Sequence, residues 1–143
     1  MADLDIARYL RPGDTVLIGQ AAAEPPVLVE KFIAAARDIG GLTAFCGYTL
    51  SDAWDGVSAG KPHIKAYVAH GPLRRLSAKG LVEIVPWHYN RIEEFIAAGH
   101  IRIDVVLLQV APADTEGWRG RGSPSSPWRR RTRTAARAGS SGP

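Results

Sequence analysis

The stretch DTVLIGQAAAEPPVLVEKFIAAARDI, residues 14–39, decides the fold. It begins with a short apolar and β-branched run, Thr15 to Ile18, which is typical of a buried strand. A loop of small residues, Gly19 to Glu24, follows. Pro25-Pro26 then opens an amphipathic run, because proline suits a first helical turn. The stretch predicts strand, loop and helix in succession, with backbone N–H groups and the positive end of the helix dipole facing whatever lies beside the loop.

The predicted helix has one apolar face and one charged face, as a helix packed on a sheet requires. The apolar face holds Leu28, Phe32, Ala35, Ala36 and Ile39. Gly40-Gly41 ends the helix, since glycine tolerates the left-handed conformation of a helix C-terminus.

Further strands and helices alternate along the chain. Strands are predicted at residues 42–46, 64–69, 81–85 and 103–110, and helices at residues 2–10, 72–79 and 90–99. Asn90 and Glu93 have the spacing of a capping box at the start of the last helix, and residues 47–60 read as a polar loop. This alternation predicts an α/β fold with an open, mostly parallel sheet flanked by helices. Residues 103–110 form the most hydrophobic run and are predicted to be a central strand.

In such a sheet, ligands bind at the carboxyl ends of the strands. Those ends are predicted at residues 19–24, 47–51, 70–71, 86–89 and 111–117. The position of a binding site therefore follows from the strand pattern alone.

Composition narrows the class of protein. The 143 residues suffice for one domain with a core, no apolar run reaches membrane-spanning length, and no signal peptide is expected. Cys46 is the only cysteine, which excludes an internal disulfide and indicates a small core residue in a cytoplasmic protein. His63, His70 and His100 lack metal-ligand spacing, and no metal is predicted.

The charge is unevenly distributed. Residues 1–118 hold 11 basic and 14 acidic residues, a net charge of −3, whereas residues 119–143 hold seven arginines and no acid. We call residues 119–143 the arginine tail. It lacks Leu, Ile, Val, Phe and Met, so its composition cannot form a core and predicts disorder.

Several segments resemble one family. RPGDTVLIGQAAAEPPVLVE, FCGYTLSD, GPLRRLSAKGLVEIVPWHYN and IDVVLLQVAPADTEG stand in the order and register found in the acetyl-CoA hydrolase/transferase family, which includes 4-hydroxybutyrate CoA-transferases. The resemblance covers about residues 6–118. It implies that residues 1–118 are the N-terminal α/β domain of a two-domain enzyme, truncated here.

The resemblance also implies a chemistry. In the family, a glutamate attacks the acyl-CoA thioester, an acyl-glutamyl anhydride and then a glutamyl-CoA thioester form, and a second carboxylic acid collects the CoA. The nucleophile lies in the C-terminal half, so no catalytic residue is assigned here. The resemblance implies acyl-CoA and a short carboxylic acid as substrates, no permanently bound cofactor, and a C-terminal-domain partner or a homo-oligomer. Either transferase or hydrolase activity fits, and a chain without that glutamate is expected to be inactive alone.

The resemblance favours a contact surface for CoA or the acyl group at the strand ends, although small residues there also suit a compact turn. The predicted binding residues are Gly19, Gln20, Ala21, Glu24, Pro25, Gly47, Tyr48, Ser51, His88 and Tyr89. Gln20 has both a donor and an acceptor, whereas Glu24 either orients a partner or stabilises the helix N-terminus. His88 also fits a structural hydrogen-bonding role.

Two further hypotheses concern the arginine tail. Its composition changes abruptly after Trp118 within a family motif, which indicates an out-of-frame or truncated gene product. Alternatively, Arg129-Arg130-Arg131 and Arg133, with Trp128 nearby, could bind nucleic acid electrostatically. The second reading is the weaker one, because nothing else in the tail offers an aromatic platform.

Overall fold

The sheet is parallel throughout and all its strands run in one direction. The structure, a computed structural model, describes residues 4–58, 61–110 and 133–134. The strand order is β4-β3-β2-β1-β5-β6. The strands are β1 (Thr15–Ile18), β2 (Thr43–Cys46), β3 (His63–Ala66), β4 (Val82–Ile84), β5 (Val105–Leu107) and β6 (Arg133–Thr134). The predicted α/β class is confirmed, and "mostly parallel" becomes wholly parallel among these strands.

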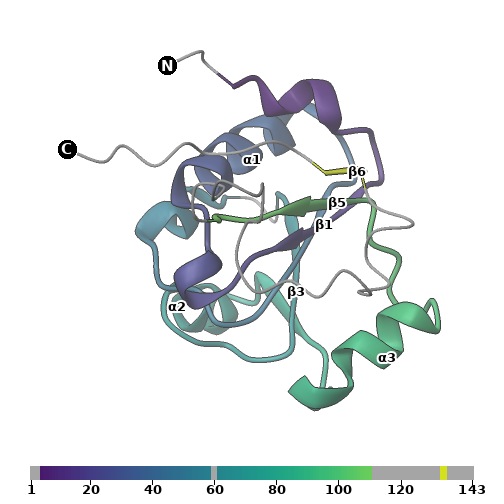
Figure 1. Ribbon diagram of the computed structural model, residues 1–143. Helices are drawn as coiled ribbons and strands as arrows, with labels where there is room; N and C mark the ends of the chain where they lie inside the picture. The colour runs from purple at the N-terminus through teal and green to yellow at the C-terminus, as the bar shows by residue number, and fades with distance from the viewer. Residues whose placement is uncertain (1–3, 59–60, 111–132, 135–143) are drawn as a thin grey trace.

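Short helices connect the strands. The α-helices are α1 (Pro26–Asp38), α2 (Pro72–Ala78) and α3 (Ile92–Ala97), and the 3-10 helices are η1 (Ile6–Tyr9), η2 (Ala21–Ala23), η3 (Asp52–Gly56) and η4 (Tyr89–Arg91). In Figure 1, α1 and α2 lie on one side of the sheet, and α3 lies on the other side toward the lower right. Parallel strands require such crossover connections, since a hairpin can join only antiparallel neighbours.

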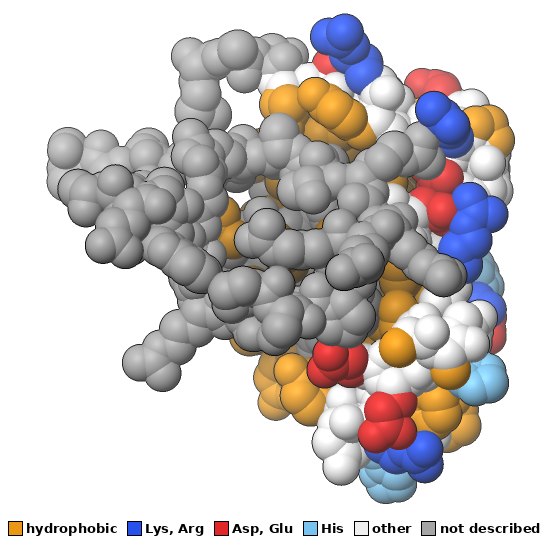
Figure 2. Space-filling model, turned by 45° about the vertical axis from the view of Figure 1, so that its right-hand side comes forward, with side chains coloured by type: hydrophobic (Ala, Val, Ile, Leu, Met, Phe, Trp, Pro, Cys, Tyr) orange, Lys and Arg blue, Asp and Glu red, His pale blue; other side chains and the backbone are white. Residues whose placement is uncertain are grey.

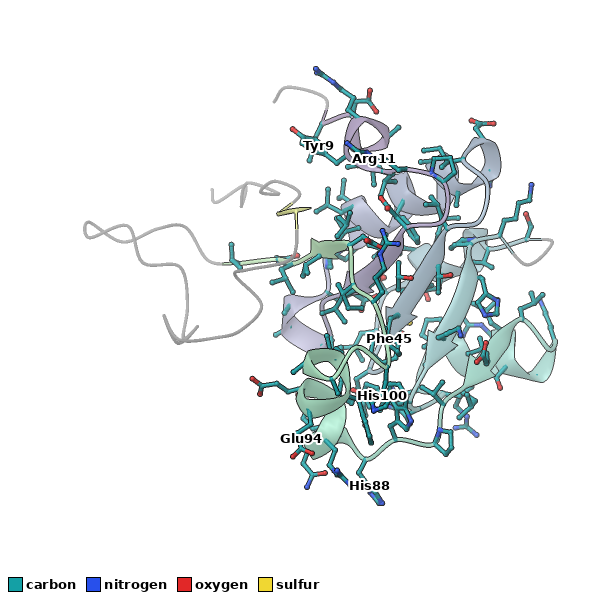
Figure 3. All side chains as sticks on the ribbon, turned by 90° about the vertical axis from the view of Figure 1, so that its right-hand side faces the viewer. Tyr9, Arg11, Phe45, His88, Glu94 and His100 are labelled. Carbon is teal, nitrogen blue, oxygen red and sulfur yellow. The ribbon has the colours of Figure 1, made fainter. Side chains whose placement is uncertain are left out.

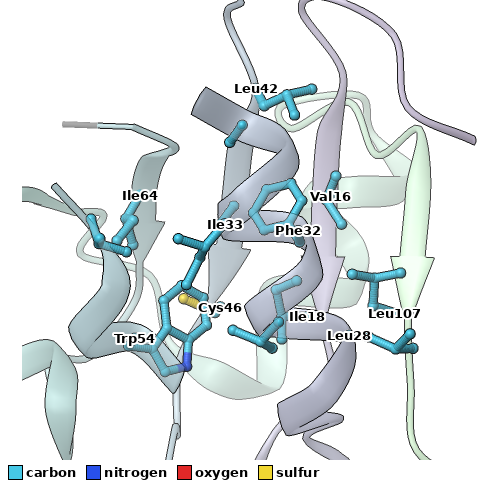
Figure 4. Close-up of a cluster of buried hydrophobic side chains, with 14 of the residues drawn as sticks. Val16, Ile18, Leu28, Phe32, Ile33, Leu42, Cys46, Trp54, Ile64 and Leu107 are labelled. Carbon is cyan, nitrogen blue, oxygen red and sulfur yellow. The ribbon is translucent and has the colours of Figure 1, made fainter. Parts of the chain in front are cut away.

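The main core fills the space between α1 and the sheet. Figure 4 shows Leu28, Phe32 and Ile33 of α1 facing Val16 and Ile18 of β1. Each of these side chains is at most 3% exposed. Alternate residues of a strand face opposite sides, so the even-numbered residues of β1 belong to this core. The predicted apolar face of the helix is confirmed, with Val29 and Ile33 added to it.

The other face of the sheet is covered by the segment around α3. Phe45, which is 1% exposed, packs against Trp87 with a ring-centroid distance of 6.4 Å, and Trp87 packs against Phe95 of α3 at 4.6 Å. Figure 3 shows Phe45 lying between the sheet and the segment that holds His100. α3 itself has no buried residue, so this layer is thinner than the one built on α1.

Three local predictions are wrong. The capping box of Asn90 and Glu93 does not form: Asn90 lies inside η4, α3 begins at Ile92, and Arg91 pairs with Glu94 at 3.0 Å instead. The hydrophobic run at residues 103–110 yields a strand of only three residues, next to the short β6, while β2 and β1 hold the centre. Hydrophobicity signals burial, but position in the sheet depends on the order in which strands pair.

The predicted polar loop at residues 47–60 is also wrong in part. It contains η3, whose Trp54 is fully buried against the core. One aromatic residue among polar neighbours gives no periodicity, so the pattern of the sequence did not reveal this buried anchor.

Of the arginine tail, the structure describes Arg133 and Thr134, which form β6 and pair with Val105 and Val106 of β5. The prediction of disorder otherwise falls outside the described residues, as do the basic residues 129–131. On the face drawn in Figure 2, Lys and Arg side chains are interspersed with Asp and Glu. Within the described ranges, no helix has both the length and the apolar character needed to cross a bilayer.

Candidate functional site

Polar and aromatic side chains gather where the first four strands end. Gln20 follows β1, Tyr48 follows β2, Tyr67 and His70 follow β3, and Tyr89 follows β4. We call these five residues the Gln20 cluster. The carboxyl ends of parallel strands meet at one edge, so residues far apart in sequence become neighbours there. In Figure 3, Arg11, before β1, lies at one end of the sheet, and His88, after β4, lies at the other.

Two donors hold the Gln20 side chain. The backbone N–H of Tyr48 donates to Gln20 Oε1 at 3.2 Å, and the Tyr67 hydroxyl donates to the same oxygen. The backbone N–H of Ala21 in turn donates to the Tyr48 carbonyl at 2.9 Å. A backbone N–H is only a donor, so the atom facing it must be the amide oxygen, which fixes which way the amide is turned. The Gln20 amide nitrogen therefore faces away from both partners.

Tyr67 rests on a glycine. The register pairs Cys46 with Ala66, which places Gly47 beside Tyr67 at the end of adjacent strands. A Cβ at Gly47 would overlap the Tyr67 ring. Burial raises the pKa of the Tyr67 hydroxyl, and nearby Tyr89 raises it further. Tyr67 is thus a neutral donor at any physiological pH.

Aromatic rings line the cluster. Tyr67 and Tyr89 have a ring-centroid distance of 5.6 Å, and Tyr48 stacks on His70 at 3.8 Å with an interplanar angle of 18°. Tyr48 and Tyr89 are 45% and 70% exposed, so part of each ring is open to solvent. His70 Nδ1 is buried and has no hydrogen-bond partner among the described residues.

Glu24 behaves differently from the cluster. Its side chain is 4% exposed and accepts four hydrogen bonds from η3 and the segment just before it. The donors are the Leu50 backbone N–H at 2.6 Å, the Ser51 backbone N–H at 3.2 Å, the Ser51 hydroxyl at 2.8 Å and Trp54 Nε1 at 2.8 Å. Both carboxylate oxygens each receive two donors, so Glu24 and Ser51 fasten the loop after β2 to the start of α1.

The loop after β1 offers few backbone donors. The N–H groups of Gly19, Ala21, Ala23 and Glu24 all donate to carbonyls of the chain. Pro25 and Pro26 have no N–H, and Pro26 is the first residue of α1. The expectation that this loop presents backbone N–H groups to a ligand is therefore wrong for these positions, whereas the N–H groups of Gln20 and Ala22 donate to no backbone carbonyl among the described residues.

The other predicted residues are spread around the edge. Gly19 packs closely, since a Cβ there would come within 2.9 Å of Leu108 Cδ2, and Pro25 is buried. Ala21 adopts a positive φ of 49°. His88 is exposed and points away from the sheet (Figure 3). Of the predicted residues, Gln20, Tyr48 and Tyr89 meet in the cluster, and Gly47 supports it.

The sequence prediction missed Tyr67 as a site residue. It placed His70 at a strand end where a ligand could bind, but did not include it among the predicted binding residues. Tyr67 was placed inside a strand predicted to run to residue 69, but β3 ends at Ala66. The sequence did hold one signal for Tyr67: a glycine, Gly47, follows one predicted strand, and a tyrosine stands near the end of the next strand.

The cysteine and His63 have structural surroundings. Cys46 is a buried core residue, as predicted; burial above all, and the Glu24 carboxylate to a lesser degree, raises the pKa of its thiol. His63 pairs with Glu83 at 2.8 Å. In the part of the chain that the structure describes, no three His, Cys, Asp or Glu side chains could hold a metal ion.

The fold is that of a CoA-transferase-like domain. The structure of RipA from Yersinia pestis is similar, with a TM-score of 0.60 and 26% identity over 77% of this chain and 28% of that chain. A variant of RipA gives a TM-score of 0.63 and 26% identity over 80% of this chain and 29% of that one. The 4-hydroxybutyrate CoA-transferase of Porphyromonas gingivalis shares the fold, with a TM-score of 0.53 and 21% identity over 78% of this chain and 24% of that chain.

The chain spans less than a third of the length of these neighbours. No protein-family model matches it, and no curated protein matches it in sequence. The likeness therefore supports the fold class, and membership of the acetyl-CoA hydrolase/transferase family stays a prediction.

Proposed function

We propose that this chain forms the acyl-CoA-binding N-terminal part of a CoA-transferase or acetyl-CoA hydrolase. The main support is that a CoA-transferase-like fold carries the Gln20 cluster at the sheet edge where ligands of parallel sheets bind. The substrates are an acyl-CoA and a short carboxylic acid. In this proposal the reaction moves CoA from the first acyl group to the second through a carboxylate nucleophile.

The chain's own predicted binding residues contribute no nucleophile. Glu24 is the only carboxylate among them, and four donors within the chain occupy its oxygens. A carboxylate so stabilised is a poor nucleophile, because attack would require it to give up those hydrogen bonds. We therefore propose that the isolated chain binds CoA compounds without turning them over.

The test measures binding and turnover on the same preparation of the 143-residue chain. Isothermal titration calorimetry with CoA and acetyl-CoA reports binding, and mass spectrometry reports formation of propionyl-CoA from acetyl-CoA and propionate. We expect binding without product. Absence of binding to either compound refutes the proposal. Product formation refutes the assignment of the nucleophile to another part of the enzyme, provided that the rate falls in a Gln20→Met variant purified in the same way.

A non-catalytic role is the alternative. The solved neighbours are more than three times as long as their match to this chain, which favours a partner that supplies the remainder of the fold, either a separate C-terminal subunit or a second copy. Binding of CoA without turnover fits this role too. A separately expressed C-terminal half can be added to the chain to distinguish the two roles. Exchange activity that appears with this half, and not with buffer, would support an enzyme that needs a partner and exclude the non-catalytic role.

A further inference from the structure

We infer that the Gln20 side-chain NH₂ is a fixed hydrogen-bond donor for the oxygen of an acyl group, and that Tyr67 is the positioning residue that aims it. This inference rests on the proposed function and adds the chemical group that the cluster recognises. It follows from the hydrogen bonds around one amide.

The amide has a single allowed orientation. Rotating the Gln20 side chain by half a turn would place its NH₂ against the Tyr48 N–H, so that two donors faced each other. The Tyr48 N–H therefore excludes the flipped amide. The Tyr67 hydroxyl, which can donate or accept, is a second contact that holds the amide in this position.

The nitrogen end is free to bind. Gln20 is half-buried, and within the described residues Nε2 has no hydrogen-bond partner. It is not sealed inside the protein either, since His70 Nδ1 is the only buried side-chain nitrogen or oxygen without a partner in those residues. A donor that is oriented, accessible and unpaired needs no reorganisation when an acceptor arrives, which is the condition for specific recognition.

The surroundings select the type of acceptor. The cluster consists of an amide, three phenols and an imidazole, and none of the ion pairs described involves it. A phosphate is normally held by Arg, Lys or a run of backbone N–H groups. Neutral donors between aromatic faces suit a thioester carbonyl or a single carboxylate, with the apolar acyl chain against the rings. The acyl end of the substrate is therefore the part that fits here.

Nuclear magnetic resonance can observe this donor directly. The chain has two glutamines, Gln20 and Gln109, and one asparagine, Asn90, so its spectrum holds only three pairs of side-chain NH₂ signals. Gln109 is exposed and follows β5, which makes it a matched internal control at the same end of the sheet. Adding sodium butyrate should shift the Gln20 pair and leave the Gln109 and Asn90 pairs in place.

Binding measurements give the second readout. CoA and acetyl-CoA differ by the acyl group alone, so the ratio of their dissociation constants isolates its contribution. Gln20→Met keeps the size of the side chain and removes the donor, and it should reduce the preference for acetyl-CoA by about fivefold while CoA binding stays the same. Gln109→Met should change neither. Tyr67→Phe should lower the preference by about twofold, because Gln20 is then held by the Tyr48 N–H alone.

The outcomes separate this inference from the proposed function. Butyrate shifting the Gln20 signals while neither CoA nor acetyl-CoA binds would support the donor and refute CoA binding. Equal acetyl-CoA preference in the wild type and Gln20→Met, with unshifted Gln20 signals, would overturn the donor and leave the proposed function standing. A preference that falls equally in Gln20→Met and Gln109→Met would also overturn it, since the effect would then not depend on the cluster.

Discussion

Gln20 and Glu24 lie four residues apart in one loop, yet the structure uses them in opposite ways. The Glu24 carboxylate is buried and receives four donors from the chain, so nothing of it remains for a ligand. The Gln20 amide receives two donors at its oxygen and keeps its nitrogen free. Of two polar side chains that look equally promising in a sequence, one is thus a structural anchor and the other is the proposed binding group.

The difference has a physical cause. Burying a charge requires nearly all its hydrogen-bonding capacity to be filled by the protein. A neutral amide at a half-open edge has no such requirement, because water can satisfy what the protein does not. Completeness of internal hydrogen bonding, rather than residue type, separates the two roles.

The largest effect expected is on stability, from Glu24→Ala. Four donors would lose their acceptor, including the indole N–H of the buried Trp54, and we expect a loss of about 3 kcal/mol in the free energy of unfolding. Urea denaturation followed by tryptophan fluorescence measures it. Glu30→Ala, at an exposed position of α1, is the control and should cost less than about 0.5 kcal/mol.

The contrast with Gln20 sharpens this prediction. Gln20→Met should cost no more than about 1 kcal/mol in the same experiment, since only two hydrogen bonds at a half-open site are lost. Equal losses for Glu24→Ala and Gln20→Met would break the distinction between anchor and binding group.

A loss smaller than that of Glu24→Ala is expected at Gly47, which lies beside Tyr67. In Gly47→Ala the new methyl group would overlap the Tyr67 ring and displace it, at a cost of about 2 kcal/mol. The Gln20 NH₂ signals should move in the same variant, because Tyr67 no longer fixes the amide. Gly40→Ala is the matched control, since a Cβ there meets no atom within 4 Å. An unchanged spectrum in Gly47→Ala would show that the glycine does not position Tyr67.

The smallest effect concerns pH. The folded-state pKa of Tyr67 is raised above its value in the unfolded chain, so the stability that this neutral hydroxyl contributes is complete below about pH 10. It is lost as the pH rises through the folded-state pKa. Absorbance at alkaline pH, which reports phenolate, should show one tyrosine titrating later than the others in the folded protein. Tyr67→Phe should remove that late step, and its persistence in the variant would assign it to another tyrosine.

Much of the fold was predictable from particular residues. The run from Thr15 to Ile18 is the strand that the sequence predicted, and the helix after it differs from its prediction by one residue at each end. Both depend on local regularities, a continuous apolar run and a helical spacing of apolar residues, that need no distant partner. Pro26 marked the start of the helix for a reason that is also local, because the N–H that proline lacks would have no partner in a first turn.

Prediction failed where distant segments decide the outcome. Trp54 is buried because Glu24 and α1 lie beside η3. The residues next to Trp54 in the sequence form no pattern that predicts this burial. Tyr67 reaches Gln20 across 47 residues because β3 and β1 lie on either side of β2. The end of β3, three residues earlier than predicted, turned Tyr67 from a strand residue into a site residue.

The sequence by itself determined the α/β class, the succession of strands and helices, and the edge at which a ligand should bind, because these follow from periodicity and from the direction of parallel strands. Only the tertiary structure decided which polar groups at that edge are already satisfied. The Glu24 carboxylate found four donors and the Gln20 nitrogen found none among the described residues, and that outcome depends on how β2 and β3 bring Tyr48, Ser51 and Tyr67 to the loop after β1.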